Sequence, residues 1–280
     1  MFCLSSSHAR ALEKFCSGSK GSVVDLRASL LGLIVGFVVG LTGTGGGALL
    51  TPLLILLGWA TPVVAVGTDL VWGTLTKATG AFVHWRQGTV DFTIVKRLSL
   101  GSIPGALVGL VVLAHLRTWG EDAMDFLVVR VLGVALMCVA LSLFLRSFRG
   151  NQRAAGDGKS DNLQGSAWLT PLAGAVVGFL VSLTSVGSGS LIIACLVILY
   201  RGTSLRRIVG SDIVHALVLV GVSALGHLGI GTINPRLLAA LLVGSIPGVW
   251  FGSRMSAAFP EKALRPVLGT TLLLLGYKLL

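Results

Sequence analysis

Three ionisable side chains, Asp69, Lys77 and His84, lie in one apolar segment of the chain, residues 62–84. At about 100° per residue of an α-helix, Lys77 lies about 80° and His84 about 60° around the axis from Asp69, so all three share one face. An ionised group at the centre of a bilayer costs at least about 2.5–3.5 kcal/mol, so such groups face the protein interior and have functions. The carboxylate could carry a proton and the ammonium could attract an anion. Lys77 could instead snorkel toward Arg86, and His84 could mark the membrane interface.

The second half of the chain repeats this pattern with changes. Asp212 and His227 are again 15 residues apart, but Val220 takes the place of the lysine. His215 is added at the position that corresponds to Trp72 in the first half. The candidates for carrying a coupling proton are therefore Asp69, Asp212, His84 and His227.

Two stretches of small residues interrupt the longest apolar segments. Residues 42–47 are Thr-Gly-Thr-Gly-Gly-Gly, and residues 184–190 are Thr-Ser-Val-Gly-Ser-Gly-Ser. Glycine costs roughly 1 kcal/mol per residue in a helix relative to alanine, so both stretches predict a helix that opens at membrane depth. Lipid cannot bond the freed backbone groups, which must be buried in protein or line a polar cavity.

The N–H groups at the start of a half-helix favour an anion, so the two breaks predict an anion site. Close packing of helices is the alternative explanation, but packing motifs recur every four residues whereas these stretches are contiguous. The candidate substrate-binding residues are Lys77, Thr42, Gly43, Thr44, Gly45, Gly46, Gly47, Thr184, Ser185, Gly187, Ser188, Gly189 and Ser190.

Motifs for other chemistry are missing. The histidines have no metal-ligand spacing, the four cysteines form no CxxC pair, and no GK[ST] sequence follows the glycine-rich stretch. No Ser/His/Asp set has support from a motif. We therefore expect no catalytic residues, no metal and no cofactor.

The composition indicates an all-α integral membrane protein. Of the 280 residues, 54% are hydrophobic and only 12% are charged, whereas soluble domains have about 25% charged residues. The net charge of +11 suits loops that stay in the cytoplasm, and no motif for binding nucleic acid accompanies it. Residues 1–27 lack the apolar core of a secretory signal, so they predict a polar tail that is not cleaved.

Eight apolar segments follow the tail. A membrane span needs about 20 residues, and the first and fifth segments are too long for one span and too short for two. These two are also the segments that contain the breaks. The segments cover residues 28–58, 62–84, 98–116, 127–146, 168–200, 205–228, 237–255 and 264–280.

The two halves of the chain resemble each other in the same order, at an offset of 142 and then 143 residues. The hexapeptide Val-Gly-Thr-Asp-Leu-Val at residues 66–71 returns as Val-Gly-Ser-Asp-Ile-Val, and Gly-Ser-Ile-Pro-Gly occurs at both 101–105 and 244–248. This pattern predicts two homologous repeats, each with one broken helical segment and three transmembrane helices. The expected boundaries are a tail at 1–27, repeats at 28–147 and 168–280, and a cytoplasmic linker at 148–167.

The relative orientation of the repeats stays open at this stage. If each long segment crosses the membrane once, the repeats are parallel; if each is a re-entrant hairpin, they are inverted. Both arrangements place 13 Lys and Arg residues inside and 7 outside, so the positive-inside rule does not choose between them.

The chain resembles the sulfite exporter TauE/SafE family over residues 28–280. The resemblance rests on GFVVGLTGTGGGALLTP at 36–52, on VGTDL at 66–70 leading to Lys77 and His84, and on the paired Ser-Ile-Pro-Gly motifs. It implies a small two-repeat permease that moves sulfur-containing anions such as sulfite or sulfonates. The second half departs from this pattern because it lacks Pro52, where it has Ala194, and Lys77.

These observations predict a secondary transporter, not an enzyme, that exports small sulfur-containing oxyanions across the cytoplasmic (inner) membrane and is coupled to protons. The expected partners are a small anionic substrate, the lipid bilayer and a second copy of the chain in a homo-oligomer, without nucleic acid. A passive anion channel is one alternative. A membrane enzyme or assembly factor of redox metabolism is another, and it would bind a metal or haem.

Overall fold

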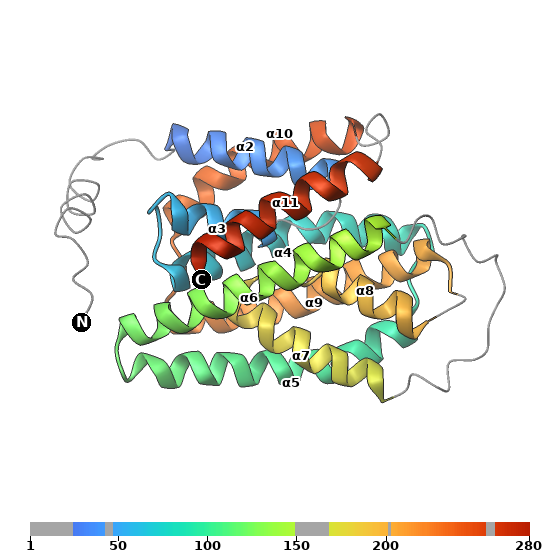
Figure 1. Cartoon of the computed structure of the whole chain (residues 1–280), viewed down its shortest axis with the longest axis horizontal. Helices are drawn as coiled ribbons and strands as arrows, with labels where there is room; N and C mark the ends of the chain where they lie inside the picture. Colours follow the sequence, from blue (N-terminus) through green and yellow to red (C-terminus); the bar gives the residue numbers. More distant parts are fainter. Residues whose placement is uncertain (1–24, 43–46, 149–167, 201–202, 256–260) are drawn as a thin grey trace.

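All regular secondary structure in the described part of the chain is α-helical. The computed structural model describes residues 25–42, 47–148, 168–200, 203–255 and 261–280. Ten helices occur in these ranges (Figure 1). They are α2 (Leu26–Thr42), α3 (Gly47–Leu56), α4 (Pro62–Arg86), α5 (Phe92–Arg117), α6 (Glu121–Phe148), α7 (Leu169–Thr184), α8 (Ser190–Leu199), α9 (Leu205–Ile230), α10 (Pro235–Met255) and α11 (Glu261–Leu279).

Each of the two longest apolar segments consists of two helices, α2 with α3 and α7 with α8. The helices α3 and α8 have 10 residues each, about 15 Å at 1.5 Å per residue, which is half of the hydrocarbon thickness. Between α7 and α8, Ser185 has a φ of 61° and Gly187 a φ of 105°. These left-handed conformations end α7, because a helix cannot continue through them.

Among the helices of the described residues, four are long and apolar enough to cross a membrane. They cover Phe92–Arg117, Glu121–Leu145, Arg206–Ile230 and Pro235–Met255. The helix α4 has a similar length of 25 residues, but Asp69, Lys77 and several threonines lower its hydropathy. Because α4 carries these polar groups, it has to be shielded from lipid by its neighbours.

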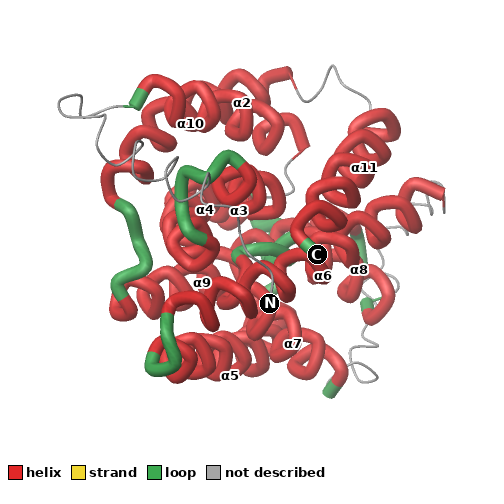
Figure 2. The backbone as a smooth tube through the Cα atoms, turned by 60° about the vertical axis from the view of Figure 1, so that its left-hand side comes forward, coloured by secondary structure: helices red, strands yellow, loops and turns green. Residues whose placement is uncertain are grey.

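The helix pairs α2–α10 and α5–α7 each run parallel and lie side by side in both views of the backbone (Figure 1, Figure 2). Gly32 lies against Leu241 and Gly40 against Val249, so residue numbers rise together along α2 and α10. Gly101 lies against Pro171 in the same way along α5 and α7. Small residues every four positions let the backbones of membrane helices approach closely. Each broken segment is therefore held by a helix from the other half of the chain.

The helices α4 and α9 form an antiparallel pair at the centre of the molecule. Gly67, near the start of α4, lies against Thr232, just after the end of α9, whereas Gly80 lies against Ile213 near the start of α9. The helices α6 and α11 are also antiparallel, because Gly133 lies against the C-terminal Leu280 and Phe144 lies against Gly269.

Two apolar clusters lie on either side of the α4–α9 pair. One contains Leu70, Leu98, Val181, Leu196 and Leu219, which come from α4, α5, α7, α8 and α9. The other contains Val35, Leu50, Trp72, Leu136, Leu241 and Leu272, which come from α2, α3, α4, α6, α10 and α11. The fold thus encloses α4 and α9 between two packed groups of helices, each drawn from both halves of the chain.

Two matching hydrogen bonds join the ends of this central pair to the neighbouring helices. The Asp91 N–H, just before α5, donates to Ser211 Oγ of α9 at 2.7 Å. The Asn234 N–H, just before α10, donates to Thr68 Oγ1 of α4 at 3.1 Å. Because the two donors are 143 positions apart and so are the two acceptors, equivalent positions make equivalent bonds across the halves.

The close approach of α10 to α2 predicts a strong effect of one methyl group. A Cβ atom at Gly244 would lie 1.7 Å from the Ser29 carbonyl oxygen, so Gly244→Ala has to push the two helices apart. We expect a loss of about 1–3 kcal/mol of stability, seen as a lower thermal unfolding midpoint in detergent. The control is Gly229→Ala in α9, where a Cβ atom would meet nothing within 4 Å. Equal unfolding midpoints for the two variants would contradict this account of the packing.

Candidate functional site

The break between α7 and α8 is buried throughout. Residues 184–190 all have low exposure, with Thr184 at 0% and Ser188 at 5%. The Thr184 hydroxyl donates to the Leu180 carbonyl at 2.7 Å and accepts the Val186 N–H at 3.2 Å. Thr42 at the end of α2 donates in the same manner to the Val38 carbonyl. Both threonines therefore stabilise the last turn of a half-helix.

The glycines and serines of this break lead into a new helix start. Gly189 is the N-cap of α8, and its carbonyl accepts the Ile193 N–H at 2.9 Å. The first N–H groups of α8, from Ser190 onward, have no acceptor within their own helix. Gly187 supplies a left-handed conformation that a side chain would strain. The stretch thus presents backbone N–H groups and hydroxyls in the protein interior.

Lys77 of α4 reaches this break. Its Nζ atom donates a hydrogen bond to Ser188 Oγ at 2.5 Å, across 111 positions of sequence. The Lys77 side chain is half-buried, and its charge acts on the carboxylates of Asp212 and Asp69. The lysine, the acids and the second break, all of which the sequence predicted to be functional, therefore lie together.

Asp69 is fully buried and makes one hydrogen bond to a side chain that sequence reasoning did not select. The Thr51 hydroxyl of α3 donates to Asp69 Oδ2 at 2.6 Å. The other oxygen, Oδ1, has no hydrogen-bond partner, and the Ser185 side chain lies close to this carboxyl group. Asp212 of α9 is likewise buried, at 2% exposure.

The two breaks meet at Gly47 and Ser185. A Cβ atom at Gly47, the first residue of α3, would lie 2.2 Å from the Ser185 carbonyl oxygen and 2.9 Å from Ser185 Oγ. Only glycine fits at this contact between the start of α3 and the end of α7. Gly43, Thr44, Gly45 and Gly46 lie outside the described residues.

His84 and His227 each form a hydrogen bond with a threonine in the loop that follows their own helix. His84 Nδ1 lies 2.9 Å from Thr89 Oγ1, and His227 Nδ1 lies 2.8 Å from Thr232 Oγ1. His227 Nε2 is also 2.8 Å from the Ser182 carbonyl oxygen of α7. These bonds give both histidines a structural part at the ends of the α4–α9 pair, and neither of the two is bonded to Lys77.

Two further polar contacts connect the central pair to α5 and α10. Trp72 Nε1 of α4 donates to Ser245 Oγ of α10 at 2.7 Å, and His215 Nε2 of α9 lies 2.7 Å from Ser102 Oγ of α5. Sequence reasoning did not select these serines, although the exact return of Gly-Ser-Ile-Pro-Gly was the signal that could have identified them.

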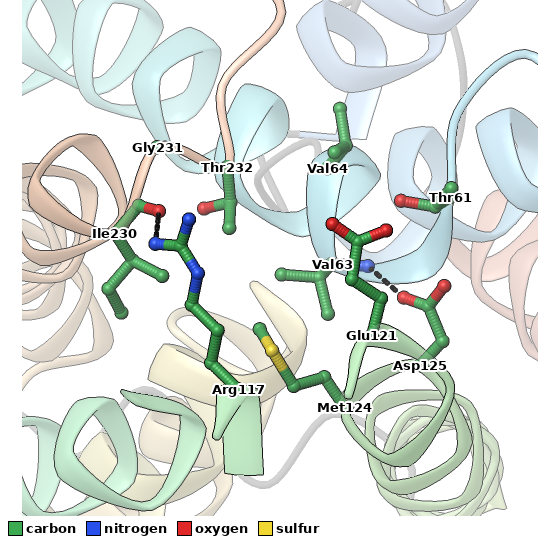
Figure 3. A pocket seen from close by; sticks show the side chains of 10 residues that line it. All are labelled: Thr61, Val63, Val64, Arg117, Glu121, Met124, Asp125, Ile230, Gly231 and Thr232. Atoms are coloured by element: carbon green, nitrogen blue, oxygen red, sulfur yellow. Dashed lines mark hydrogen bonds between the residues drawn. The ribbon is translucent and has the colours of Figure 1, made fainter. Parts of the chain in front are cut away.

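A cavity of about 190 Å³ opens at one end of the α4–α9 pair (Figure 3). Arg117 reaches across it to donate to the Ile230 carbonyl, and Asp125 accepts the Val63 N–H at 3.1 Å. Thr232, which bonds to His227, also lines it. The cavity contains none of the residues that the sequence selected for binding or proton transfer.

The arrangement around Lys77 can bind an anion. An ammonium group, a serine hydroxyl and free backbone N–H groups all donate hydrogen bonds, and charge-assisted bonds are the strongest of these. The carboxylates of Asp69 and Asp212 compete with any anion for the same ammonium group. Protonation of one acid removes its part of that competition.

Comparison with known proteins finds a matching family model and similar named proteins. The family model described as Sulfite exporter TauE/SafE matches residues 28–279. The chain is 42% identical over 251 residues to a Bacillus subtilis protein named Probable membrane transporter protein YjnA, a match that covers 90% of this chain and 98% of that protein. It is 27% identical to the B. subtilis protein YunE, named in the same way, over 90% of this chain and 95% of that one. No solved structure matches.

The apolar helices and the names of the relatives together indicate that this protein is a multi-pass membrane transporter. Because the family model covers nearly the whole helical part of the chain, this chain belongs to the sulfite exporter TauE/SafE family.

Proposed function

We propose that this protein is a secondary transporter that exports small sulfur-containing oxyanions, such as sulfite or organosulfonates, across the cytoplasmic membrane in a proton-coupled cycle. The observation that carries the proposal is the hydrogen bond between Lys77 and Ser188, because it joins a charged group of α4 to the buried break between α7 and α8. The description of the family supports sulfite as a substrate and export as the direction.

The substrate anion binds at Lys77 and the two helix breaks. Lys77 supplies the positive charge, Ser188 a hydroxyl, and the first turn of α8 its free N–H groups. A half-helix start that is buried in protein is a site that transporters use for anionic substrates.

Asp69 and Asp212 couple the anion to a proton. Each carboxylate attracts the Lys77 ammonium group while it is ionised, which weakens the attraction of Lys77 for a substrate anion. A proton on one of these acids weakens the pull of the carboxylates on the ammonium group, so proton binding and anion binding favour each other. His227 and His84, at opposite ends of the α4–α9 pair, pass protons between this site and the two membrane surfaces.

The two halves of the chain form inverted repeats. Equivalent central helices, α4 and α9, run antiparallel, and α2 runs parallel to α10. Because α10 follows α9 through the short loop at 231–234, α10 runs antiparallel to α9 and therefore parallel to α4. The helices α2 and α4 thus point the same way, and α3 has to turn back between them. Each long segment is then a hairpin of two half-helices. Inverted repeats around a central site allow access to alternate between the two sides of the membrane.

The inverted arrangement predicts which loops share a side of the membrane. Arg206 Nη2 donates to Gln87 Oε1 at 3.4 Å, so these two positions lie on one face. In a background without the four native cysteines, we expect single cysteines at positions 87 and 206 to react with a membrane-impermeant thiol reagent from one side. Single cysteines at 119 and 231 should react from the opposite side. Reaction of 87 and 206 from opposite sides would support parallel repeats instead.

Removal of the Lys77 charge should weaken substrate binding. A hydrogen bond to a charged group contributes about 1.5–3 kcal/mol, so we expect Lys77→Met to raise the KM for sulfite uptake into proteoliposomes about tenfold or more. Lys96→Met is the control, because Lys96 is an exposed lysine on α5. An unchanged KM in Lys77→Met would overturn the assigned role of this lysine.

Loss of the Asp69 carboxylate should uncouple transport from protons. Asparagine has nearly the same shape and can still accept the Thr51 bond, so Asp69→Asn should fold and bind sulfite. We expect it to lose the accumulation that a pH gradient drives in the wild type, whereas Asp122→Asn at the exposed start of α6 retains it. Absence of uphill accumulation in the wild type would instead indicate a passive anion channel.

A further inference from the structure

His215 and Trp72 occupy corresponding positions in the two halves but have different polar capacity. The Trp72 indole has one polar atom, Nε1, and donates it to Ser245. The His215 imidazole has two ring nitrogens, and only Nε2 has a partner, at Ser102. The second half, which has histidine where the first half has tryptophan, thus places one more polar atom in the interior of the protein.

This additional atom, His215 Nδ1, has no hydrogen-bond partner although the whole side chain has 0% exposure. A buried polar atom without a partner destabilises the folded protein. Buried groups of this kind in native proteins call for an explanation, such as a bound ligand. An apolar residue or a second tryptophan would avoid this cost.

His215 lies next to the groups that form the candidate anion site. It follows Asp212 by three positions on α9, which is close to one helical turn. The charge of Lys77 acts on His215 as well as on Asp212 and Asp69. The lysine occurs only in the first half, because the corresponding position in the second half is Val220. The histidine occurs only in the second half, because the corresponding position in the first half is Trp72.

The bond to Ser102 indicates which ring nitrogen carries the proton. If Nε2 donated to Ser102, both the serine hydroxyl hydrogen and the Nδ1 lone pair would lack partners. If Ser102 donates to Nε2, only the Nδ1–H group lacks one. The second arrangement has fewer unpaired groups, so the neutral ring has its proton on Nδ1 and can donate it to an oxygen atom.

We propose that His215 Nδ1–H donates a hydrogen bond to an oxygen atom of the bound oxyanion, opposite the ammonium group of Lys77. This proposal rests on the transport function proposed above. It makes the anion site asymmetric, with one charged donor from α4 and one neutral donor from α9. Ser102 is then a positioning residue, because it holds the ring in the tautomer and orientation that present Nδ1.

Two amide variants separate the two ring nitrogens. In His215→Gln the amide reaches the place of Nε2, so the bond to Ser102 can persist while the donor at Nδ1 is lost. In His215→Asn the shorter amide takes the place of Nδ1. We expect His215→Gln to raise the KM for sulfite and for methanesulfonate about tenfold in proteoliposomes, with little change in kcat, and His215→Asn to stay within about threefold of the wild type.

A matched pair of serine variants tests the positioning role. Ser102→Ala and Ser245→Ala each remove a buried hydroxyl that bonds to α9 or α4 at corresponding positions. Both should lower the thermal unfolding midpoint by a similar amount. Only Ser102→Ala should reduce the shift in this midpoint that sulfite produces, because binding to the folded state stabilises it.

The outcomes are distinct. Equal KM values for His215→Gln and the wild type would overturn the proposal, and so would equal losses in His215→Gln and His215→Asn, because a merely structural histidine would not distinguish the two amides. If the wild type itself shows neither flux nor a thermal shift with sulfite and methanesulfonate, the proposed substrate class fails, and the assignment of His215 fails with it.

Discussion

The structure depends on one constraint, namely that an open stretch of backbone inside a membrane has to find its hydrogen-bond partners within the protein. The break at residues 184–190 meets this constraint because it is buried among helices from both halves of the chain. Gly47 permits α3 to begin in direct contact with Ser185, and Lys77 donates to Ser188. The close glycine contacts between α2 and α10 and between α5 and α7 hold the broken segments in place.

Charged side chains gather beside the buried break at residues 184–190. A half-buried lysine and two buried carboxylates share this site, and both acids attract Lys77 at once. In the proposed mechanism, a substrate anion competes with these carboxylates for the ammonium group. In this mechanism, a change in the charge of Asp69 or Asp212 alters the affinity for the anion directly, so proton coupling needs no large local rearrangement. The two halves differ at this point, since Lys77 and His215 have no equivalents in the other half.

Much of the candidate site could be predicted from the sequence, because its parts have local signatures. A contiguous run of Gly, Ser and Thr in an apolar segment disfavours a helix wherever the segment lies, and an acid within such a segment is costly in any fold. The partners of these groups could not be predicted. Thr51 is one of several threonines in apolar segments, and nothing local distinguishes it as the donor to Asp69. Ser102 and Ser245 belonged to a visible repeat, but their bonds to His215 and Trp72 depend on how α5 and α10 pack.

The sequence by itself determined that this chain is a helical membrane protein and that its two longest apolar segments are each divided into two helices, because composition and hydropathy act over a few residues. Only the tertiary structure decided how those parts meet. Counts of Lys and Arg were equal for parallel and inverted repeats, whereas the contacts of Gly67 with Thr232 and of Gly80 with Ile213 make α4 and α9 antiparallel. The contact between Lys77 and Ser188 spans 111 positions, and its formation depends on helix packing, which no local property of either residue encodes.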